Sequence, residues 1–140
     1  LLDRHDGGET LALETIGYFS DEPNSQGFPA WPMRFLYPTR GDFIACVSDL
    51  SSRALVRGVR DAINGASSVK CHALCAPAFV PGVDLSDHRS YWQHGYRAAM
   101  VTDTAFYRNE AYHTAADTID TLDFGRMAQV GTGVGAFMFG

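Results

Sequence analysis

Short apolar runs that alternate with helix patterns constrain this chain more than any other feature. The runs lie at residues 10–18, 42–48, 69–76 and 98–102, and their lengths suit buried strands better than helices. Helix signals follow the second, third and fourth runs. Because strands that alternate with helices form layered folds, the sequence predicts an α/β sandwich with functional residues in the loops beyond the strand ends.

The first expected helix is marked by apolar residues four positions apart: Leu55, Val59 and Ile63. Asp49 or Ser51 is expected to cap it, and Gly65 lies where it would stop. Two long stretches are expected to be loops. Residues 20–40 contain four prolines, which exclude regular structure, and residues 103–118 are polar and rich in aromatic side chains.

Two further helices are expected. Ser86 is placed to cap a short helix that runs through Trp92 to Gly95, and Asp123 is placed to cap a last helix that starts at Phe124. The last helix is expected to weaken toward three glycines, each costing about 1 kcal/mol relative to alanine: Gly131, Gly133 and Gly135.

Composition excludes several classes of protein. With 46% hydrophobic and 19% charged residues the chain is typical of a globular domain, and its 140 residues suit one domain or part of one. A net charge of −5 argues against a nucleic-acid partner, because phosphate binding needs clustered basic residues. We find no apolar stretch of the roughly 18 residues that a membrane-spanning helix needs.

The cysteines and the first residues carry little functional signal. Three cysteines leave at most one disulfide, and Cys71, His72 and Cys75 make a poor zinc pattern on a predicted strand, so buried thiols are the favoured interpretation. Residues 1–4 lack the pattern of a signal peptide. The sequence starts without an initiator methionine, which is compatible with a chain that begins within a longer protein.

Three segments could carry chemistry. His113, in the second long loop, could be a metal ligand or an ordinary surface histidine. Glu14, at a predicted strand, must be paired, protonated or metal-bound unless it faces water at a sheet edge, and the pattern leaves both interpretations open. The acidic and hydroxyl groups of residues 84–88 lie at a helix start, where they could simply cap the helix.

These segments belong to four motifs that resemble a known family. The motifs are LETIGYFSDEPNSQ, GDFIACVSDLSSRALVR, PGVDLSDHRSYWQHGY and MVTDTAFYRNEAYHTAADTIDTLDFGRMAQV. In that order, over residues 11 to about 130, the chain resembles the C-terminal half of the zinc aminopeptidases related to bacterial leucyl aminopeptidase. Glutamate carboxypeptidases and glutaminyl cyclases are more distant relatives. The resemblance implies a three-layer sandwich with a mixed sheet between helices, of which residues 1–140 are the C-terminal portion of one domain.

The resemblance also implies roles for two metal ligands. In the family, two zinc ions lie together at the strand ends, and each is held by a histidine, a carboxylate and a shared aspartate. By motif position, Glu14 is similar to the carboxylate ligand of one zinc, and His113 to the histidine ligand of the other. Carboxylate and imidazole are both suitable zinc ligands. We therefore expect Glu14 and His113 to lie close together.

Further positions are implied around these ligands. Ser86, Asp87 and His88 resemble groups that steady the metal ligands by hydrogen bonds. The loop through Phe106, Tyr107 and Asn109 is expected to shape the substrate pocket.

Several parts of the family's site have no match here. The first zinc histidine, the bridging aspartate and the paired acids that include the general base lie upstream of the segment matching LETIGY, so no catalytic base is expected in this chain. His5 and Asp6 imitate the family's His-x-Asp motif, but that motif lies far earlier in the family, and we interpret the likeness as coincidence. Val83 and Asp84 stand near the place where some aminopeptidases carry an oxyanion-stabilising tyrosine.

The expected function is therefore part of a two-zinc metallopeptidase that removes N-terminal residues from peptides, inactive as this chain alone. One alternative is an acyltransferase that resembles glutaminyl cyclase and uses a single zinc. Another is a metal-free interaction domain on the same fold, against which the retention of both Glu14 and His113 argues. The sequence leaves the compartment and the preferred side chain open.

Overall fold

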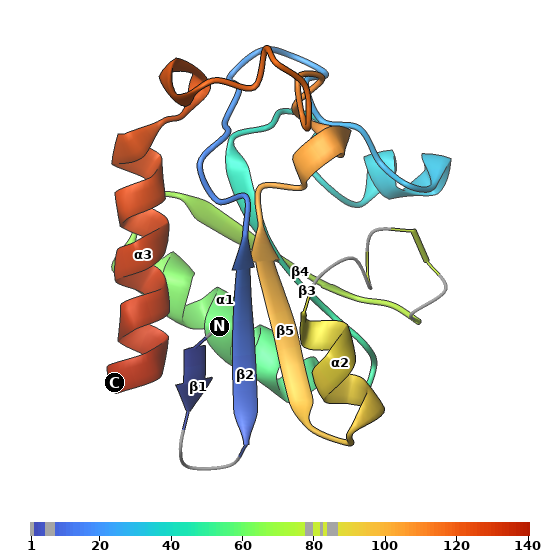
Figure 1. The fold of residues 1–140 in the computed structure, drawn as a ribbon, viewed down its shortest axis with the longest axis vertical. Coiled ribbons are helices and arrows are strands. Elements are labelled where there is room, and N and C mark those ends of the chain that lie inside the picture. The colour runs from blue at the N-terminus through green and yellow to red at the C-terminus, as the bar shows by residue number, and fades with distance from the viewer. Residues whose placement is uncertain (1, 5–7, 78–79, 82, 84–86) are drawn as a thin grey trace.

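The computed structural model of the protein describes residues 2–4, 8–77, 80–81, 83 and 87–140, with only the backbone described for residues 2–4. Figure 1 shows helices packed against a central sheet. The described strands are β1 (Leu2–Arg4), β2 (Glu9–Glu14), β3 (Phe43–Ser48), β4 (Lys70–Cys75) and β5 (Arg97–Thr102). The described α-helices are α1 (Arg53–Ala66), α2 (His88–Gln93) and α3 (Phe124–Phe139). Short 3-10 helices span Trp31–Phe35, Ala105–Tyr107 and Ile119–Thr121.

The sheet is mixed, as expected. In the described part of the chain its five strands have the order β1-β2-β5-β3-β4. β2 runs parallel to β5, and β3 runs parallel to β4, whereas β5 and β3 are antiparallel. The carboxyl ends of β2 and β5 therefore meet at one edge of the sheet, where loops carry function in folds of this kind.

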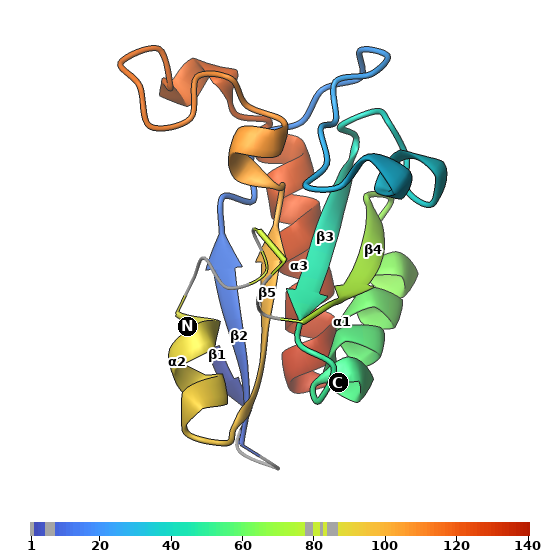
Figure 2. The ribbon, with the colours of Figure 1, turned by 90° about the vertical axis from the view of Figure 1, so that its right-hand side faces the viewer.

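The two faces of the sheet are covered differently. α1 and α3 pack on one face, and their buried side chains join those of the strands in one apolar cluster. The other face carries a smaller cluster from β3, β5 and the segment before α2, with Trp92 of α2 packed against it. Figure 2 shows α2 on the opposite side of the sheet from α1 and α3. The predicted α/β sandwich is confirmed.

The four predicted strands are present, but the first is shorter than expected. β2 ends at Glu14 instead of continuing to Tyr18. The reason is a tertiary contact beyond the strand end: the backbone N–H groups of Gly17 and Tyr18 donate to the carboxylate of Asp103. Glu14 is thus an exposed residue at the strand end rather than an acid within a strand.

α1 follows its predicted apolar stripe, since Leu55, Val59 and Ile63 are all buried. The expected cap was wrong, because neither Asp49 nor Ser51 is the N-cap residue. Ser52 is the N-cap residue, and the Asp49 carboxylate accepts the backbone N–H of Ser52 at 3.1 Å. The helix ends within one residue of Gly65.

α3 begins as predicted, because the Asp123 side chain accepts the Arg126 backbone N–H at 2.9 Å. The expected weakening was wrong, since the helix continues to Phe139. A Cβ at Gly133 would lie 2.7 Å from the Cα of Ile63 in α1. The missing side chain thus lets the two helices approach closely, and this packing offsets the propensity cost of the glycine.

The structure also bears on the expected loop at residues 20–40, the start of α2 and the cysteines. Residues 20–40 form a loop interrupted by the 3-10 helix Trp31–Phe35. α2 starts at His88 with Asp87 at its N-cap position, where no side-chain cap is formed, while Ser86 lies outside the described residues. Cys46, Cys71 and Cys75 are free thiols, and burial raises the pKa of Cys71 to about 12.

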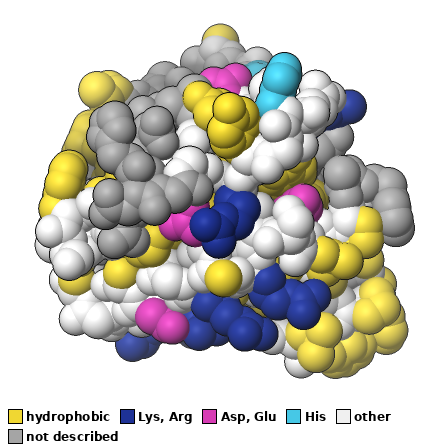
Figure 3. Space-filling model, turned by 90° about the horizontal axis from the view of Figure 1, so that it is seen from below, with side chains coloured by type: hydrophobic (Ala, Val, Ile, Leu, Met, Phe, Trp, Pro, Cys, Tyr) yellow, Lys and Arg dark blue, Asp and Glu magenta, His cyan; other side chains and the backbone are white. Residues whose placement is uncertain are grey.

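The end of the molecule where β2 and β5 begin carries mixed charge. Figure 3 looks at this end and shows basic side chains next to carboxylates. Arg97 and Glu9, the first residues of β5 and β2, form an ion pair at 3.2 Å. Among the described residues, no helix combines the length and the apolar character needed to cross a bilayer.

Candidate functional site

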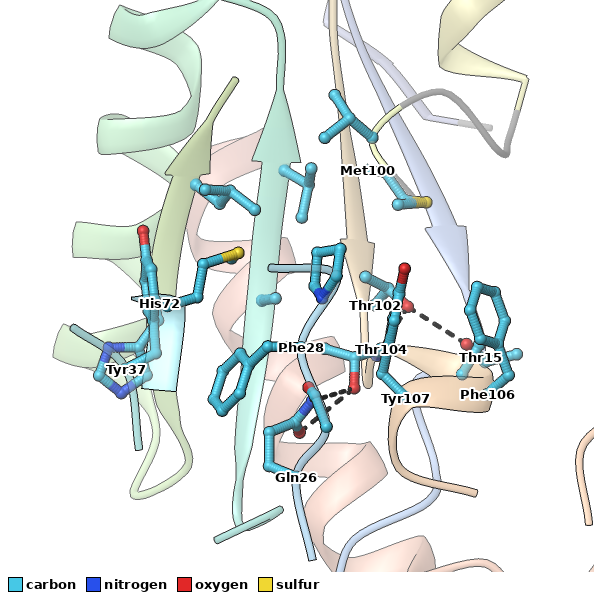
Figure 4. A pocket seen from close by; sticks show the side chains of 18 of the residues that line it. Thr15, Gln26, Phe28, Tyr37, His72, Met100, Thr102, Thr104, Phe106 and Tyr107 are labelled. Carbon is cyan, nitrogen blue, oxygen red and sulfur yellow. Dashed lines mark hydrogen bonds between the residues drawn. The ribbon is translucent and has the colours of Figure 1, made fainter. Parts of the chain in front are cut away.

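A pocket of about 110 Å³ lies on the α2 face of the sheet, at the edge where β2 and β5 end. Its floor is formed by strand residues, and its rim by the 3-10 helix Ala105–Tyr107 and residues 26–37 (Figure 4). Its large apolar side chains include Phe28, Met33, Phe43, Leu74, Met100 and Phe106. The pocket is therefore apolar, which is typical of sites that enclose a substrate side chain.

A row of paired residues crosses the floor of this pocket. Glu14 of β2 pairs with Thr102 of β5, which pairs with Ala45 of β3, which pairs with His72 of β4. All four line the pocket. Because paired residues point to the same face of a sheet, the row runs from a carboxylate at one end to an imidazole at the other, with small residues between.

Glu14 lies where β2 gives way to a left-handed residue. Thr15 has φ of 46°, and its hydroxyl donates to the Glu14 carbonyl at 2.7 Å. The same hydroxyl lies 3.2 Å from that of Thr102 in β5. These contacts fix the end of β2 and so the direction in which the exposed Glu14 side chain leaves the strand.

His113 also has a left-handed backbone, with φ of 60°. Its exposed imidazole stacks on the ring of Tyr112 at 3.8 Å. Tyr112 lines the same pocket as Glu14. Tyr112 thus links the His113 loop to the pocket, and a direct approach of His113 to Glu14 stays a prediction.

The loops after β2 and β5 are joined by the buried carboxylate of Asp103. It accepts the backbone N–H groups of Tyr18 at 2.8 Å, Gly17 at 3.2 Å and Ala105 at 3.0 Å. Burial raises the pKa of Asp103, and the bond from Tyr18 opposes that rise. One carboxylate therefore holds both loops.

Arg108 joins the same loops from the other side. Its buried guanidinium donates to the side-chain oxygen of Gln26 at 2.9 Å and to the carbonyls of Phe43 at 2.9 Å and Tyr18 at 3.2 Å. Burial lowers the pKa of Arg108 to about 10. A Cβ at Gly41 would lie 2.7 Å from the Arg108 side chain, so only glycine leaves room for it.

Sequence analysis did not single out Asp103 or Arg108. The available signal was an aspartate directly after an apolar strand, and an arginine within an otherwise aromatic loop. Together these two residues brace the loop that follows Glu14 against the loop that carries His113, and we call them the Asp103–Arg108 brace.

Left-handed backbone conformations concentrate on these two loops. Besides Thr15 and His113, Thr104 has φ of 76° and Ala105 has φ of 47°. For residues other than glycine such conformations cost about 1–3 kcal/mol each and cluster at functional sites. The strain, together with the brace that holds it, makes this edge the candidate site.

The predicted pocket residues divide between two places. Phe106 and Tyr107 line the apolar pocket. Asn109 is buried in the wall of a second pocket of about 170 Å³, where its side-chain nitrogen donates to Asp117 at 3.1 Å. Its oxygen accepts the Ala111 backbone N–H, so Asn109 shapes the His113 loop.

The predicted supporting segment before α2 contacts the pocket wall. His88 is buried, with Nε2 2.6 Å from the carbonyl of Val83 and its ring 4.5 Å from that of Trp92. Val83 lines the pocket. Asp87 is exposed, and Ser86 and Asp84 lie outside the described residues. Hydrogen bonds from this segment to a metal ligand stay a prediction.

The described residues supply only part of what a zinc site requires. Glu14 and His113 supply donor types that zinc accepts. Among the residues that the structure describes, however, no group of three or more His, Cys, Asp or Glu side chains is arranged to hold a metal. Since a catalytic zinc usually has three protein ligands, the described chain fits only as part of such a site.

The family model of Peptidase family M28 matches residues 41–138. The chain belongs to peptidase family M28. This M28 chain is 48% identical over 124 residues to the uncharacterized protein YfbL of Escherichia coli K12, covering 89% of the chain and 38% of YfbL. It is 31% identical over 90 residues to leucine aminopeptidase 1 of Ajellomyces dermatitidis, covering 61% of the chain and 21% of that protein.

The fold of the M28 chain matches part of a solved aminopeptidase. LapA aminopeptidase of Legionella pneumophila superposes with a TM-score of 0.63 at 20% identity, covering 93% of the chain and 30% of LapA. The chain therefore spans well under half the length of these relatives. The predicted family and the predicted fold are both confirmed.

Proposed function

We propose that residues 1–140 are the C-terminal portion of a two-zinc M28 exopeptidase domain that removes N-terminal residues from peptides. Membership of the M28 family and the leucine aminopeptidase relatives support this proposal. The observation that carries it is the placement of Glu14 and the Tyr112–His113 loop beside one apolar pocket.

In this proposal Glu14 holds one zinc ion and His113 holds the other. The remaining ligands, a shared carboxylate and the general base come from residues that precede this chain in the whole protein. When bound, a zinc pair lowers the pKa of a water molecule and polarises the scissile carbonyl. The chain's own part is to present two ligands and to keep them in place through the Asp103–Arg108 brace.

The pocket supplies the other half of the function. Its walls exclude water and enclose the side chain of the N-terminal residue, while Glu14 at its edge keeps the metal site next to the scissile bond. Orientation of this kind converts binding energy into rate, because the reacting groups are already aligned.

The test uses the full-length protein in which this chain occurs, with zinc content and hydrolysis of aminoacyl p-nitroanilides as readouts. Glu14→Gln and His113→Ala should each lower bound zinc and abolish most turnover. The matched controls Glu22→Gln and His94→Ala change exposed residues away from the pocket and should leave both readouts unchanged.

Three results would contradict the proposal. Zinc-dependent cyclisation of N-terminal glutamine without peptide hydrolysis would favour the acyltransferase. A folded protein that binds no zinc would favour an interaction domain. Full turnover in both Glu14→Gln and His113→Ala would remove these residues from the metal site.

A further inference from the structure

His72 lies at the far end of the floor row that starts at Glu14. Three inter-strand spacings separate β2 from β4 in the sheet order, which is about 14 Å. Thr102 and Ala45, the two residues between, are small, and all four residues of the row line the same pocket. A small side chain that enters beside Glu14 therefore stays far from His72, whereas a large one extends toward it.

Aromatic rings surround the imidazole. The Phe43 ring lies edge-on to His72 at 5.0 Å and 87°, and the Tyr37 ring lies edge-on at 6.3 Å and 86°. The Tyr37 hydroxyl donates to the Ala73 carbonyl of β4, which fixes that ring. This far wall is an incomplete aromatic cluster, and another ring could join it in the edge-to-face geometry that aromatic pairs prefer.

We propose that His72 determines specificity, by forming an aromatic far wall that only a large N-terminal side chain, above all an aromatic one, can contact. This inference rests on the proposed exopeptidase function and adds the class of substrate. A small side chain such as alanine would fill the pocket near Glu14 only and would leave the far wall unused.

The charge state of His72 fits an apolar partner. Burial lowers the pKa of His72, and Asp42 at the start of β3 partly opposes this by raising it. The phenol of Tyr37 is the titratable group packed on the ring, and Lys70 lies two residues earlier on the same face of β4. Burial therefore favours the neutral form of His72, and protonation would place a charge against the substrate's apolar side chain.

The decisive measurement is kcat/KM for phenylalanyl and alanyl p-nitroanilide with the full-length protein. His72→Ala should lower the Phe-to-Ala preference about 10-fold through KM, the order that small changes in an apolar pocket produce. His72→Phe should retain the preference. His94→Ala, which changes an exposed histidine at the end of α2, should match the parent.

A pH series separates a contact from a purely structural role. In the parent, KM for the phenylalanyl substrate should rise as pH falls below about 6.5, relative to KM for the alanyl substrate. In His72→Phe this relative rise should vanish. The inference is overturned by an unchanged preference in His72→Ala, or by the same pH dependence in His72→Phe, while hydrolysis persists. Absence of hydrolysis with every substrate would instead overturn the proposed function, and this inference with it.

Discussion

Replacing Arg108 by methionine tests the brace that joins the two site loops. Methionine keeps an apolar stem but removes the donors to one carboxamide and two backbone carbonyls. Losing three hydrogen bonds from a charged donor costs about 6 kcal/mol, at roughly 2 kcal/mol each, although the Gln26 oxygen keeps the Thr104 hydroxyl as a donor. Burial lowers the pKa of Arg108 from 12.5 to about 10, so losing the buried charge returns about 3 kcal/mol.

The expected net loss in the free energy of unfolding of Arg108→Met is therefore about 3 kcal/mol, or a fall in Tm of about 10 °C for a chain of this size. Urea unfolding followed by circular dichroism measures the loss. Arg108→Lys should lose nearly as much, because an ammonium group cannot reproduce the planar fork of donors. Arg57→Met, at an exposed position of α1, should change stability by less than about 0.5 kcal/mol.

Hydrogen exchange then tests whether the damage is local to the site. The amides of Gly17 and Tyr18 donate to Asp103, and the Gly27 amide donates to the Tyr107 carbonyl at 2.6 Å. In Arg108→Met these amides should exchange faster than those of β3. Stability equal to that of the parent, or an unchanged exchange pattern, would refute the idea that Arg108 holds the two loops together.

Four further outcomes are expected. Gly133→Ala should destabilise the protein by about 1–3 kcal/mol in thermal unfolding, since its Cβ would meet Ile63; an increase in Tm would contradict the packing argument. Asp123→Ala should cost about 1 kcal/mol through loss of the α3 cap, whereas Asp123→Asn should restore most of it. Burial keeps the pKa of His72 below its unfolded value of 6.5. The unfolded chain therefore binds more protons as pH falls through 6.5, and the free energy of unfolding drops. In pH-dependent urea unfolding, His72→Phe should remove this part of the drop. Residues 1–140 alone should bind zinc weakly and hydrolyse no peptide, and robust turnover that His113→Ala abolishes would show that these residues contain the complete site.

The sequence predicted the layers of the fold well because apolar periodicity records burial directly. β3, β4 and β5 and the stripe of α1 coincide with their apolar patterns. It predicted the end of β2 poorly, because residues 16–18 are apolar enough for a strand. The backbone N–H groups of Gly17 and Tyr18 donate instead to Asp103, which lies more than 80 positions later in the chain. No local pattern reports such a contact.

Some residues of the candidate site could be found from the sequence, and others could not. Motif resemblance located Glu14, His113, Phe106 and Tyr107 at or beside one pocket. It did not locate His72, which was considered only together with its neighbouring cysteines. Successive residues of a strand point to opposite faces of the sheet, so Cys71 joins the cluster under α1 whereas His72 faces the pocket. The alternation of faces along β4 could have been predicted from the sequence. That His72 lies across the pocket from Glu14 could be learned only from the order of the strands in the sheet.

The strained backbone conformations and the hydrogen bonds that stabilise them lie at the same edge of the sheet. Left-handed residues after β2 and β5 turn the backbone sharply beside Glu14 and before His113, and conformations of this kind persist only where surrounding contacts over-determine them. The Asp103–Arg108 brace supplies those contacts entirely from residues of this chain. The placement of the two loops therefore does not depend on additional ligands. In the proposed function, residues that complete the metal site would meet a carboxylate and a histidine loop that are already held beside the apolar pocket. The cost of ordering these loops would then fall on folding rather than on metal binding.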